Sequence, residues 1–277
     1  MSHIWSKNAL FVLMNQVLGL INLSLVPLRA KASDASEMTS QLLFGDCLEI
    51  LDKTDKWAYV RTFFDAYEGW IDYKQFIQID ADTFTKFNSS KSVLGLSIQH
   101  PIINLSTRET IYLVAGSSLP DIREGEFQIN DTRYQLQSSI ISPNPQKFAS
   151  EIIATAKFYL NSPYLWGGRS PFGIDCSGFS QLVFKQFGFR LKRDTYLQAE
   201  QGVSINFLEE AKAGDLVFFD NEHGRINHVG IMMNSAQIIH ASGKVRIDSI
   251  DSQGIFNEEL KRHTHKLRII KRMLDSE

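Results

Sequence analysis

The chain of 277 residues contains only two cysteines, Cys47 and Cys176, which lie far apart in the sequence. They cannot form the disulfide framework of a small secreted protein, and no set of Cys and His residues has the spacing of a four-ligand zinc site. An excess of charge of one sign is also lacking, because 29 Lys and Arg against 31 Asp and Glu give a net charge of -2. The sequence therefore offers no basic surface for nucleic acid, and it implies neither a metal nor a cofactor.

A long apolar stretch occurs at residues 9–28, ALFVLMNQVLGLINLSLVPL. Three amide side chains interrupt it, and a membrane-spanning helix would have to bury them in lipid. We predict two buried β-strands here, and with them a protein of the cytoplasm. The alternative is a secretory signal peptide with Ala30 and Ala32 near its cleavage site, which would place the protein outside the inner membrane.

The chain changes character along its length. Up to residue 80, short strand-like segments such as WAYVRTFF alternate with turns, which is the pattern of a small β-barrel or sandwich. Residues 81–142 show a second, weaker set of strands that ends at the proline-rich segment ISPNPQ. From residue 143 onward, two helical patterns separated by a glycine-rich loop precede a run of strands. We predict an α+β chain with domains at residues 1–80, 81–142 and 143–277.

Cys176 lies in the motif GIDCSGF, at the predicted start of a helix. A thiol attacks as the thiolate, which the N–H groups and the dipole at a helix N-terminus favour. Such a nucleophile needs a base, and the base needs a group that orients it. His228 in NHVGIMM and His240 in IIHASG lie on neighbouring predicted strands and fit these roles, whereas His265, in a charged segment, is expected to be exposed. On the residues alone, a buried structural cysteine remains the alternative.

Taken together, these motifs resemble the NlpC-type cell-wall cysteine peptidases, which have a papain-like fold. YLWGGRSPFGIDCSGFSQLVF, GDLVFFD, INHVGIMM and IIHASG occur in the family's order within residues 145–277. The resemblance implies Cys176 as the nucleophile, His228 as the base and His240 as the residue that orients the base. It also implies that the backbone N–H of Cys176 contributes to an oxyanion hole.

The first half of the chain extends the resemblance. LFGD and YEGWI are similar to motifs of the bacterial SH3-like barrel that precedes the peptidase domain in the subgroup that cleaves γ-D-glutamyl–diamino acid bonds of murein peptides. The resemblance implies a pocket for the free amino group of an N-terminal L-Ala, formed by Asp46, Tyr67, Tyr164, Asp175 and Ser177. Asp46 departs from the Glu that the subgroup tends to have. A buried ammonium needs anionic and hydrogen-bonding partners, which this set supplies.

The resemblance thus implies two small SH3-like β-barrels followed by a papain-like peptidase domain. The expected protein is a cysteine endopeptidase without stable membrane insertion; a monomer is favoured, although the sequence does not define the oligomeric state. It would hydrolyse the γ-D-glutamyl–diamino acid bond of short murein peptides with a free L-Ala, which suits peptide recycling. The alternatives are a wall-acting D,L-endopeptidase of the same family, a wall-binding protein in which Cys176 is structural, and a papain-like acyltransferase.

Overall fold

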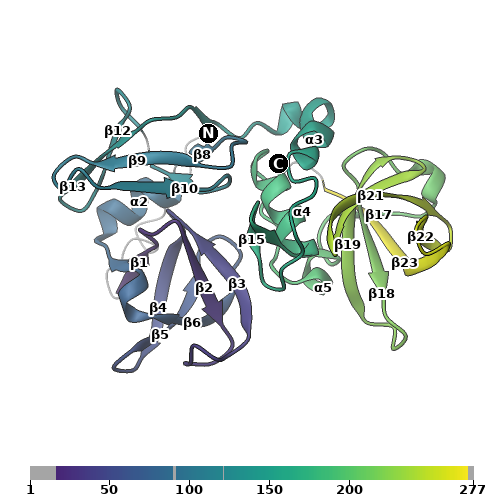
Figure 1. Cartoon of the computed structure of the whole chain (residues 1–277), viewed down its shortest axis with the longest axis horizontal. Helices are drawn as coiled ribbons and strands as arrows, with labels where there is room; N and C mark the ends of the chain where they lie inside the picture. The colour runs from purple at the N-terminus through teal and green to yellow at the C-terminus, as the bar shows by residue number, and fades with distance from the viewer. Residues whose placement is uncertain (1–16, 90–91, 121, 274–277) are drawn as a thin grey trace. The chain divides into compact units, whose positions relative to one another are not determined.

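The computed structural model describes residues 17–89, 92–120 and 122–273, and the chain divides into two compact units, residues 1–140 and 141–277 (Figure 1). Antiparallel strands are the main regular structure of both units, and the described helices are few. The predicted α+β class is therefore confirmed.

The first unit opens with a seven-stranded sheet in the order β3-β2-β6-β5-β4-β1-β7. Its strands are β1 (Val17–Leu20), β2 (Leu25–Arg29), β3 (Met38–Leu43), β4 (Cys47–Lys53), β5 (Trp57–Thr62), β6 (Glu68–Asp72) and β7 (Ile77–Gln78), with a 3-10 turn at Tyr73–Gln75. The alternation predicted for WAYVRT is present in β5, where every second residue is buried. The strands predicted within residues 9–28 appear as β1 and β2, and residues 9–16 lie outside the described residues.

The second half of this unit contains a helix that the sequence reasoning missed. The helix α2 (Ala81–Ser89) begins where the backbone N–H of Thr83 donates to Asp80 Oδ1 at 2.7 Å. After it come a four-stranded sheet and a three-stranded sheet, formed by β8 (Ser92–Leu94), β9 (His100–Asn104), β10 (Thr110–Leu113), β11 (Ser118–Leu119), β12 (Glu126–Ile129), β13 (Thr132–Leu136) and β14 (Ile140–Ile141).

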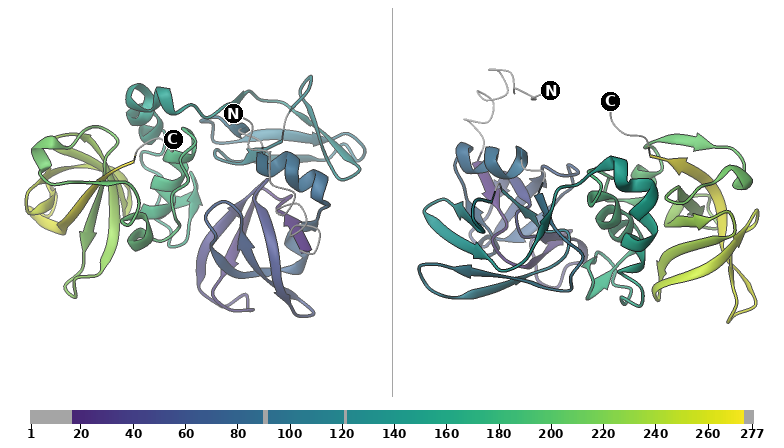
Figure 2. Two further views of the ribbon diagram at one scale, coloured as in Figure 1. Left: turned by 180° about the vertical axis from the view of Figure 1, so that it is seen from behind. Right: turned by 90° about the horizontal axis from the view of Figure 1, so that it is seen from above.

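The two halves of the first unit share a hydrophobic core. Phe84 and Phe87 of α2 belong to the same buried cluster as Leu20 of β1 and Ile102 of β9. The views agree that α2 lies against the first sheet and below the second (Figures 1 and 2). The described residues from 17 to 80 and from 81 to 140 are therefore packed as one body, and the assignment of residues 1–80 and 81–142 to separate barrel domains stays a prediction.

The second unit combines a helical layer with a closed sheet. Its helices are α3 (Phe148–Lys157), preceded by a 3-10 turn at Pro145–Lys147, α4 (Cys176–Lys185) and α5 (Thr195–Gln198), and the short strands β15 (Arg169–Ser170) and β16 (Gly173–Ile174) form a ribbon before α4. The sheet contains β17 (Val203–Ile205), β18 (Leu216–Asp220), β19 (Ile226–Asn234), β20 (Gln237–Ser242), β21 (Lys244–Asp251), β22 (Gly254–Asn257) and β23 (Arg262–Arg272), with a 3-10 turn at Leu208–Glu210. Because β22 pairs with both β21 and β23, six of these strands close on themselves.

Helix α4 is the central helix of this unit. All of its residues are buried, and it packs against β19 and β20. Phe148 of α3 packs its ring against Phe184 of α4 at a centroid distance of 5.1 Å, which joins the two predicted helices. Helix α4 is thus joined to α3 at its last turn and packs against the strands β19 and β20, which follow it in the chain.

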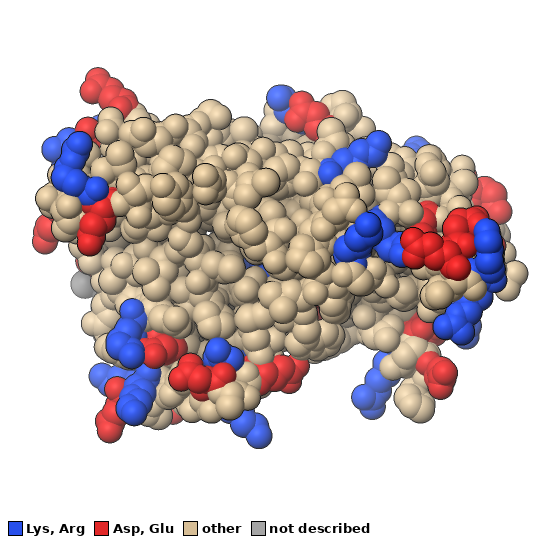
Figure 3. All heavy atoms as spheres, viewed as in Figure 1, with Lys and Arg blue, Asp and Glu red and all other residues tan. Residues whose placement is uncertain are grey.

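Charged side chains of both signs are interspersed on the face drawn in Figure 3. Several neighbours form ion pairs, such as Arg61 with Glu49 at 3.1 Å and Lys261 with Glu258 at 2.8 Å. Among the described helices, none has the length and apolar character needed to cross a membrane.

Candidate active site

Cys176 is the first residue of α4, and its side chain is buried. Asp175 caps the helix, with Oδ1 accepting a backbone N–H of the first turn at 2.7 Å. The thiol Sγ lies 3.8 Å from Thr195 Oγ1, and the backbone of Val229 acts to lower the pKa of the thiol. Val229 follows His228 in β19, the strand that carries the predicted base and against which α4 packs.

His228 and His240 lie side by side on β19 and β20. Gly230 is directly opposite His240 in the register, so His228, two residues earlier, is a diagonal neighbour on the same face. His228 Nε2 lies 2.8 Å from His240 Nδ1, and both rings are buried. A Cβ atom on Gly230 would come within 2.9 Å of the His240 Cβ. The glycine of NHVGIMM therefore lets the two strands bring the rings together.

The structure adds two side chains of β21 to this pair, and sequence reasoning missed both. Asp248 Oδ2 lies 3.0 Å from His240 Nε2 and 2.8 Å from the Nε of Arg246. In the register Arg246 lies opposite His240, and Asp248 follows two residues later on the same face. The signal was the alternation of KVRIDSID directly after IIHASG, which places Arg246 and Asp248 on one face of the next strand of a hairpin.

His265 was expected to be exposed, and the structure corrects this expectation. Its ring lies against that of His228 in a tilted arrangement, with a centroid distance of 4.2 Å and 30° between the planes. The alternate residues of β23 that include His265 and Leu267 are half-buried, while the charged residues between them point outward. Burial, with the charge of His240 acting in the same direction, lowers the pKa of His265 to about 4.

The electrostatics of the thiol differ from the expectation as well. Burial and then the charge of Asp175 raise the pKa of Cys176 to about 11, against smaller opposing contacts from Thr195 and Val229. Burial likewise lowers the pKa of His228 well below its usual value. Both groups are therefore neutral near pH 7. Because attack moves the thiol proton to the imidazole, the two opposite charges form together and stabilise each other.

Three residues of the predicted amine pocket belong to the second unit. Asp175 and Ser177 are joined by the buried Arg193, whose Nη2 lies 2.5 Å from Asp175 Oδ2 and whose Nη1 donates to Ser177 Oγ at 2.6 Å. Tyr164 is half-buried beside them, and burial, with the charges of Cys176 and Asp175, raises its pKa to about 12. The structure thus brings Tyr164, Asp175 and Ser177 to the neighbourhood of the thiol.

The other two residues of the predicted pocket, Asp46 and Tyr67, belong to the first unit. Asp46 is buried, and its Oδ2 accepts the backbone N–H of Leu43 at 2.9 Å, which closes the turn of LFGD. Tyr67 is half-buried against the core of the first sheet, and its backbone N–H donates to Thr62 Oγ1 at 3.0 Å. Their part in amine recognition stays a prediction.

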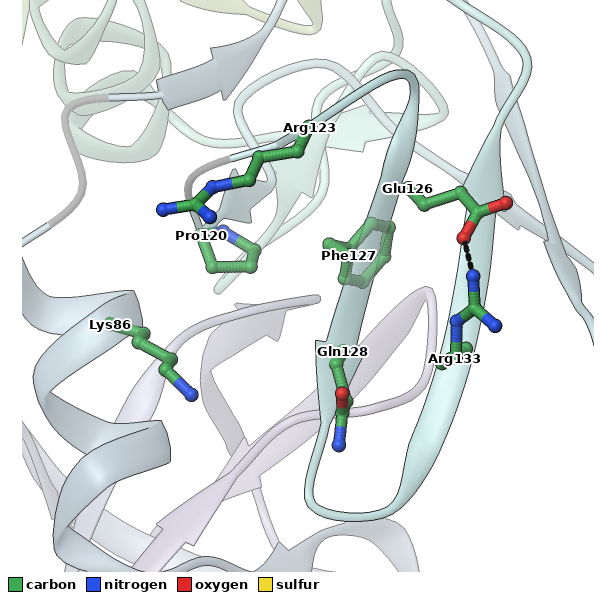
Figure 4. Close-up of a pocket in the computed structure, with 7 residues that line it drawn as sticks. All are labelled: Lys86, Pro120, Arg123, Glu126, Phe127, Gln128 and Arg133. Carbon is green, nitrogen blue, oxygen red and sulfur yellow. Dashed lines mark hydrogen bonds and ion pairs between the residues drawn. The ribbon is translucent and has the colours of Figure 1, made fainter.

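A hollow of about 500 Å³ in the first unit offers no comparable chemistry. Figure 4 shows its lining, namely Lys86, Pro120, Arg123, Glu126, Phe127, Gln128 and Arg133. Arg133 is paired with Glu126, and Lys86 with Asp82. The lining includes no Cys or His, and nowhere in the described part of the chain do three or more His, Cys, Asp or Glu side chains group so as to hold a metal ion.

A buried cysteine at a helix start, a histidine pair on the adjoining sheet and a helix-on-sheet unit define a papain-like cysteine peptidase. Comparison with known proteins agrees. The sequence model of the NlpC/P60 family matches residues 161–264, and that of the bacterial dipeptidyl-peptidase SH3 domain matches residues 28–76. The chain belongs to the NlpC/P60 family, and it is a cysteine-type peptidase.

The similar proteins cover most of the chain. It is 32% identical over 218 residues to the gamma-D-glutamyl-L-lysine dipeptidyl-peptidase of Bacillus subtilis, across 73% of this chain and 71% of that protein. The protein of the same name from Bacillus cereus is 27% identical over 253 residues, across 82% and 74%. A solved NlpC/P60 protein from Bacillus cereus shares the fold, with a TM-score of 0.77 at 20% identity over 93% of this chain and 99% of that one.

Proposed function

We propose that this chain hydrolyses the γ-D-glutamyl–diamino acid bond of murein peptides that begin with a free L-Ala, and that it serves peptide recycling. The observation that carries the proposal is the buried Cys176 at the start of α4, a helix that packs against the two strands that carry the His228–His240 pair. The names of the relatives from Bacillus subtilis and Bacillus cereus, both gamma-D-glutamyl-L-lysine dipeptidyl-peptidases, support the choice of bond.

The reaction has two steps. Sγ of Cys176 attacks the γ-carbonyl carbon while its proton moves to His228, and His228 then protonates the leaving amine of the diamino acid. In the second step a water molecule gives a proton to His228 and attacks the thioester. This releases the γ-D-glutamyl product and returns the proton to sulfur. The backbone N–H of Cys176 would stabilise the oxyanion in both steps.

The free amino group is the feature that separates this substrate from intact cell wall, where the L-Ala nitrogen is acylated. The Asp175 carboxylate already accepts two backbone N–H groups and both terminal nitrogens of Arg193. Its lone pairs are thus largely occupied. We therefore assign the direct contacts with the ammonium to the oxygens of Ser177 and Tyr164, with Asp175 supplying negative charge behind them.

The proposal is tested with L-Ala-γ-D-Glu-diaminopimelate and its N-acetylated form, followed by chromatography of the products. We expect kcat/KM to be lower for the acetylated peptide by on the order of 100-fold or more. Acetylation removes the positive charge of the amino group and blocks its hydrogen bonds to Ser177 and Tyr164. Cys176→Ser is the inactive control, and Ser177→Ala should reduce the difference between the two peptides. Equal cleavage of both peptides would overturn the free-amine requirement and favour a wall-acting endopeptidase.

A further inference from the structure

Three buried side chains form a continuous hydrogen-bonded chain that runs across β21, β20 and β19 toward the nucleophile. Asp248 Oδ2 lies 3.0 Å from His240 Nε2, and His240 Nδ1 lies 2.8 Å from His228 Nε2. We propose that Asp248 is a positioning residue that fixes the tautomer of both histidines and so makes Nδ1 of His228 the catalytic base. The proposal deepens the proposed function, because it concerns the same site and rests on that peptidase reaction.

The first member of the chain is an acceptor only. Burial alone would raise the pKa of Asp248, but hydrogen bonds from His240 and Arg246, with the charges of both, more than offset this and lower it. Asp248 is therefore ionised at neutral pH, and an ionised carboxylate cannot donate a hydrogen bond. Its contact with His240 consequently requires the proton of that ring to be on Nε2.

The protonation of the next two atoms follows from the first. A neutral imidazole with its proton on Nε2 has a lone pair on Nδ1, so His240 Nδ1 can only accept. The 2.8 Å contact then requires His228 to donate from Nε2. In a neutral ring this leaves the lone pair of His228 on Nδ1, and that lone pair takes the thiol proton. Each step uses one hydrogen bond and a neutral imidazole, and none makes an assumption about the substrate.

Arg246 holds the carboxylate in the orientation that this chain needs. Its Nη2 donates to Asp248 Oδ1 at 2.9 Å, and its Nε lies 2.8 Å from Oδ2. A guanidinium offers only donors, so it cannot compete for the proton on His240. The carboxylate is thereby kept ionised in a buried place and turned toward the histidine, which is how such outer partners fix a ring and its tautomer.

The chain also stabilises the charge that forms during attack. When the thiol proton reaches His228 Nδ1, the electron pair of the S–H bond stays on sulfur and forms the S–C bond, and the imidazole becomes an imidazolium. That cation donates through Nε2 to His240, whose far side faces the anionic Asp248. The pair of opposite charges therefore exists only once proton transfer has begun, so Asp248 lowers the barrier more than it strengthens substrate binding.

The direct test is ¹⁵N NMR of the wild-type protein with labelled histidine at neutral pH. We expect the signals of His228 and His240 to be those of imidazoles protonated at Nε2 and unprotonated at Nδ1. A proton on Nδ1 of His240 would overturn the proposal. This measurement needs neither substrate nor a variant, so it can fail while the proposed substrate is correct, and it can succeed while that substrate is wrong.

The matched substitutions are Asp248→Asn and Asp251→Asn. Asp251 lies on the same strand and also contacts a histidine, since His263 Nε2 lies 2.9 Å from its Oδ2, but that pair is outside the site. Asparagine can donate as well as accept, so at position 248 it no longer dictates the tautomer. We expect kcat to fall by on the order of 100-fold in Asp248→Asn, with little change in KM. A carboxylate bonded directly to the catalytic base costs more than this when it is lost. The expected loss is smaller here because His240 lies between Asp248 and the base.

A second readout on the same variants is the rate at which iodoacetamide alkylates Cys176 near pH 7, which requires the base but no peptide. We expect alkylation to slow in Asp248→Asn and to keep the wild-type rate in Asp251→Asn. Wild-type kcat and alkylation in a folded Asp248→Asn protein would show that the carboxylate plays no part. An equal loss in Asp251→Asn would assign the effect to the stability of β21 and would equally overturn the proposal.

Discussion

At the scale of single residues, the burial of His265 predicts how stability depends on pH. The pKa of His265 is lowered to about 4 in the folded protein, whereas an unfolded histidine titrates near 6.5. Between these values the unfolded chain binds more protons than the folded one. The free energy of unfolding therefore falls as the pH is lowered from about 6.5 to about 4. Above that range His265 is neutral in both the folded and the unfolded protein, so its protonation no longer destabilises the fold.

The variant His265→Phe keeps a ring against His228 but cannot titrate. We expect its free energy of unfolding to depend less steeply on pH across this range, with a slope smaller by up to about 1.4 kcal/mol per pH unit, which is the effect of one proton. Urea denaturation at intervals between pH 4 and pH 7 measures both slopes. Identical slopes in the two proteins would mean that His265 is not held neutral by its surroundings.

The sequence could reveal the site residues that stand in local motifs, but not those whose roles depend on how distant strands pair. Cys176, His228 and His240 were found because each stands in a motif and the spacing of neighbouring strands brings two of them together. Asp248 and His265 were missed because their roles depend on the register of β21 and on the return of β23 to close the sheet. Neither property is set by local sequence alone.

At the scale of elements, the packing of the loop before α4 against its first turn depends on Gly178. A Cβ atom there would lie 2.4 Å from the carbonyl oxygen of Gly168 and 3.1 Å from Cγ of Arg169. In an ordinary helix, replacing Gly by Ala stabilises by up to about 1 kcal/mol. Here we expect Gly178→Ala to destabilise by about 1–3 kcal/mol instead, because the loop must move. Urea denaturation measures whether the substitution raises or lowers the free energy of unfolding. A variant as stable as the parent would show that the loop moves aside at no cost.

The elements themselves were predicted to different degrees. The sequence correctly predicted helices α3 and α4 and strands β18 to β21. Their apolar residues recur with a strong period, and Asp175, Gly188 and the prolines mark where the helices begin and end. Helix α2 was missed because its Thr and Phe residues also suit strands and its neighbours are strands. Its start was nevertheless encoded by Asp80, and its buried face by Phe84 and Phe87, three residues apart.

At the scale of the whole molecule, three buried clusters of the described residues each lie within one unit. Two of them belong to residues 1–140, and one joins Phe219, Ile238 and Ile270 across the closed sheet of the second unit. Within the first unit the two halves are joined tightly at Gly45, where the backbone N–H of Ser118 donates to the carbonyl of Phe44 at 2.9 Å. Each unit thus contains a hydrophobic core of its own that stabilises it.

Two glycines, one in each unit, allow the stability of each unit to be perturbed separately. Gly45 has a φ of +83°, and a Cβ atom on it would lie 1.9 Å from the carbonyl oxygen of Ser118, so Gly45→Ala must disturb the join between the halves of the first unit. We expect calorimetry to resolve two unfolding transitions, because each unit has its own core. Gly45→Ala should lower only the first unit's transition, and Gly178→Ala only the other, by about 5 °C or more each. If either substitution moved both transitions equally, the two cores would have to unfold as one cooperative body.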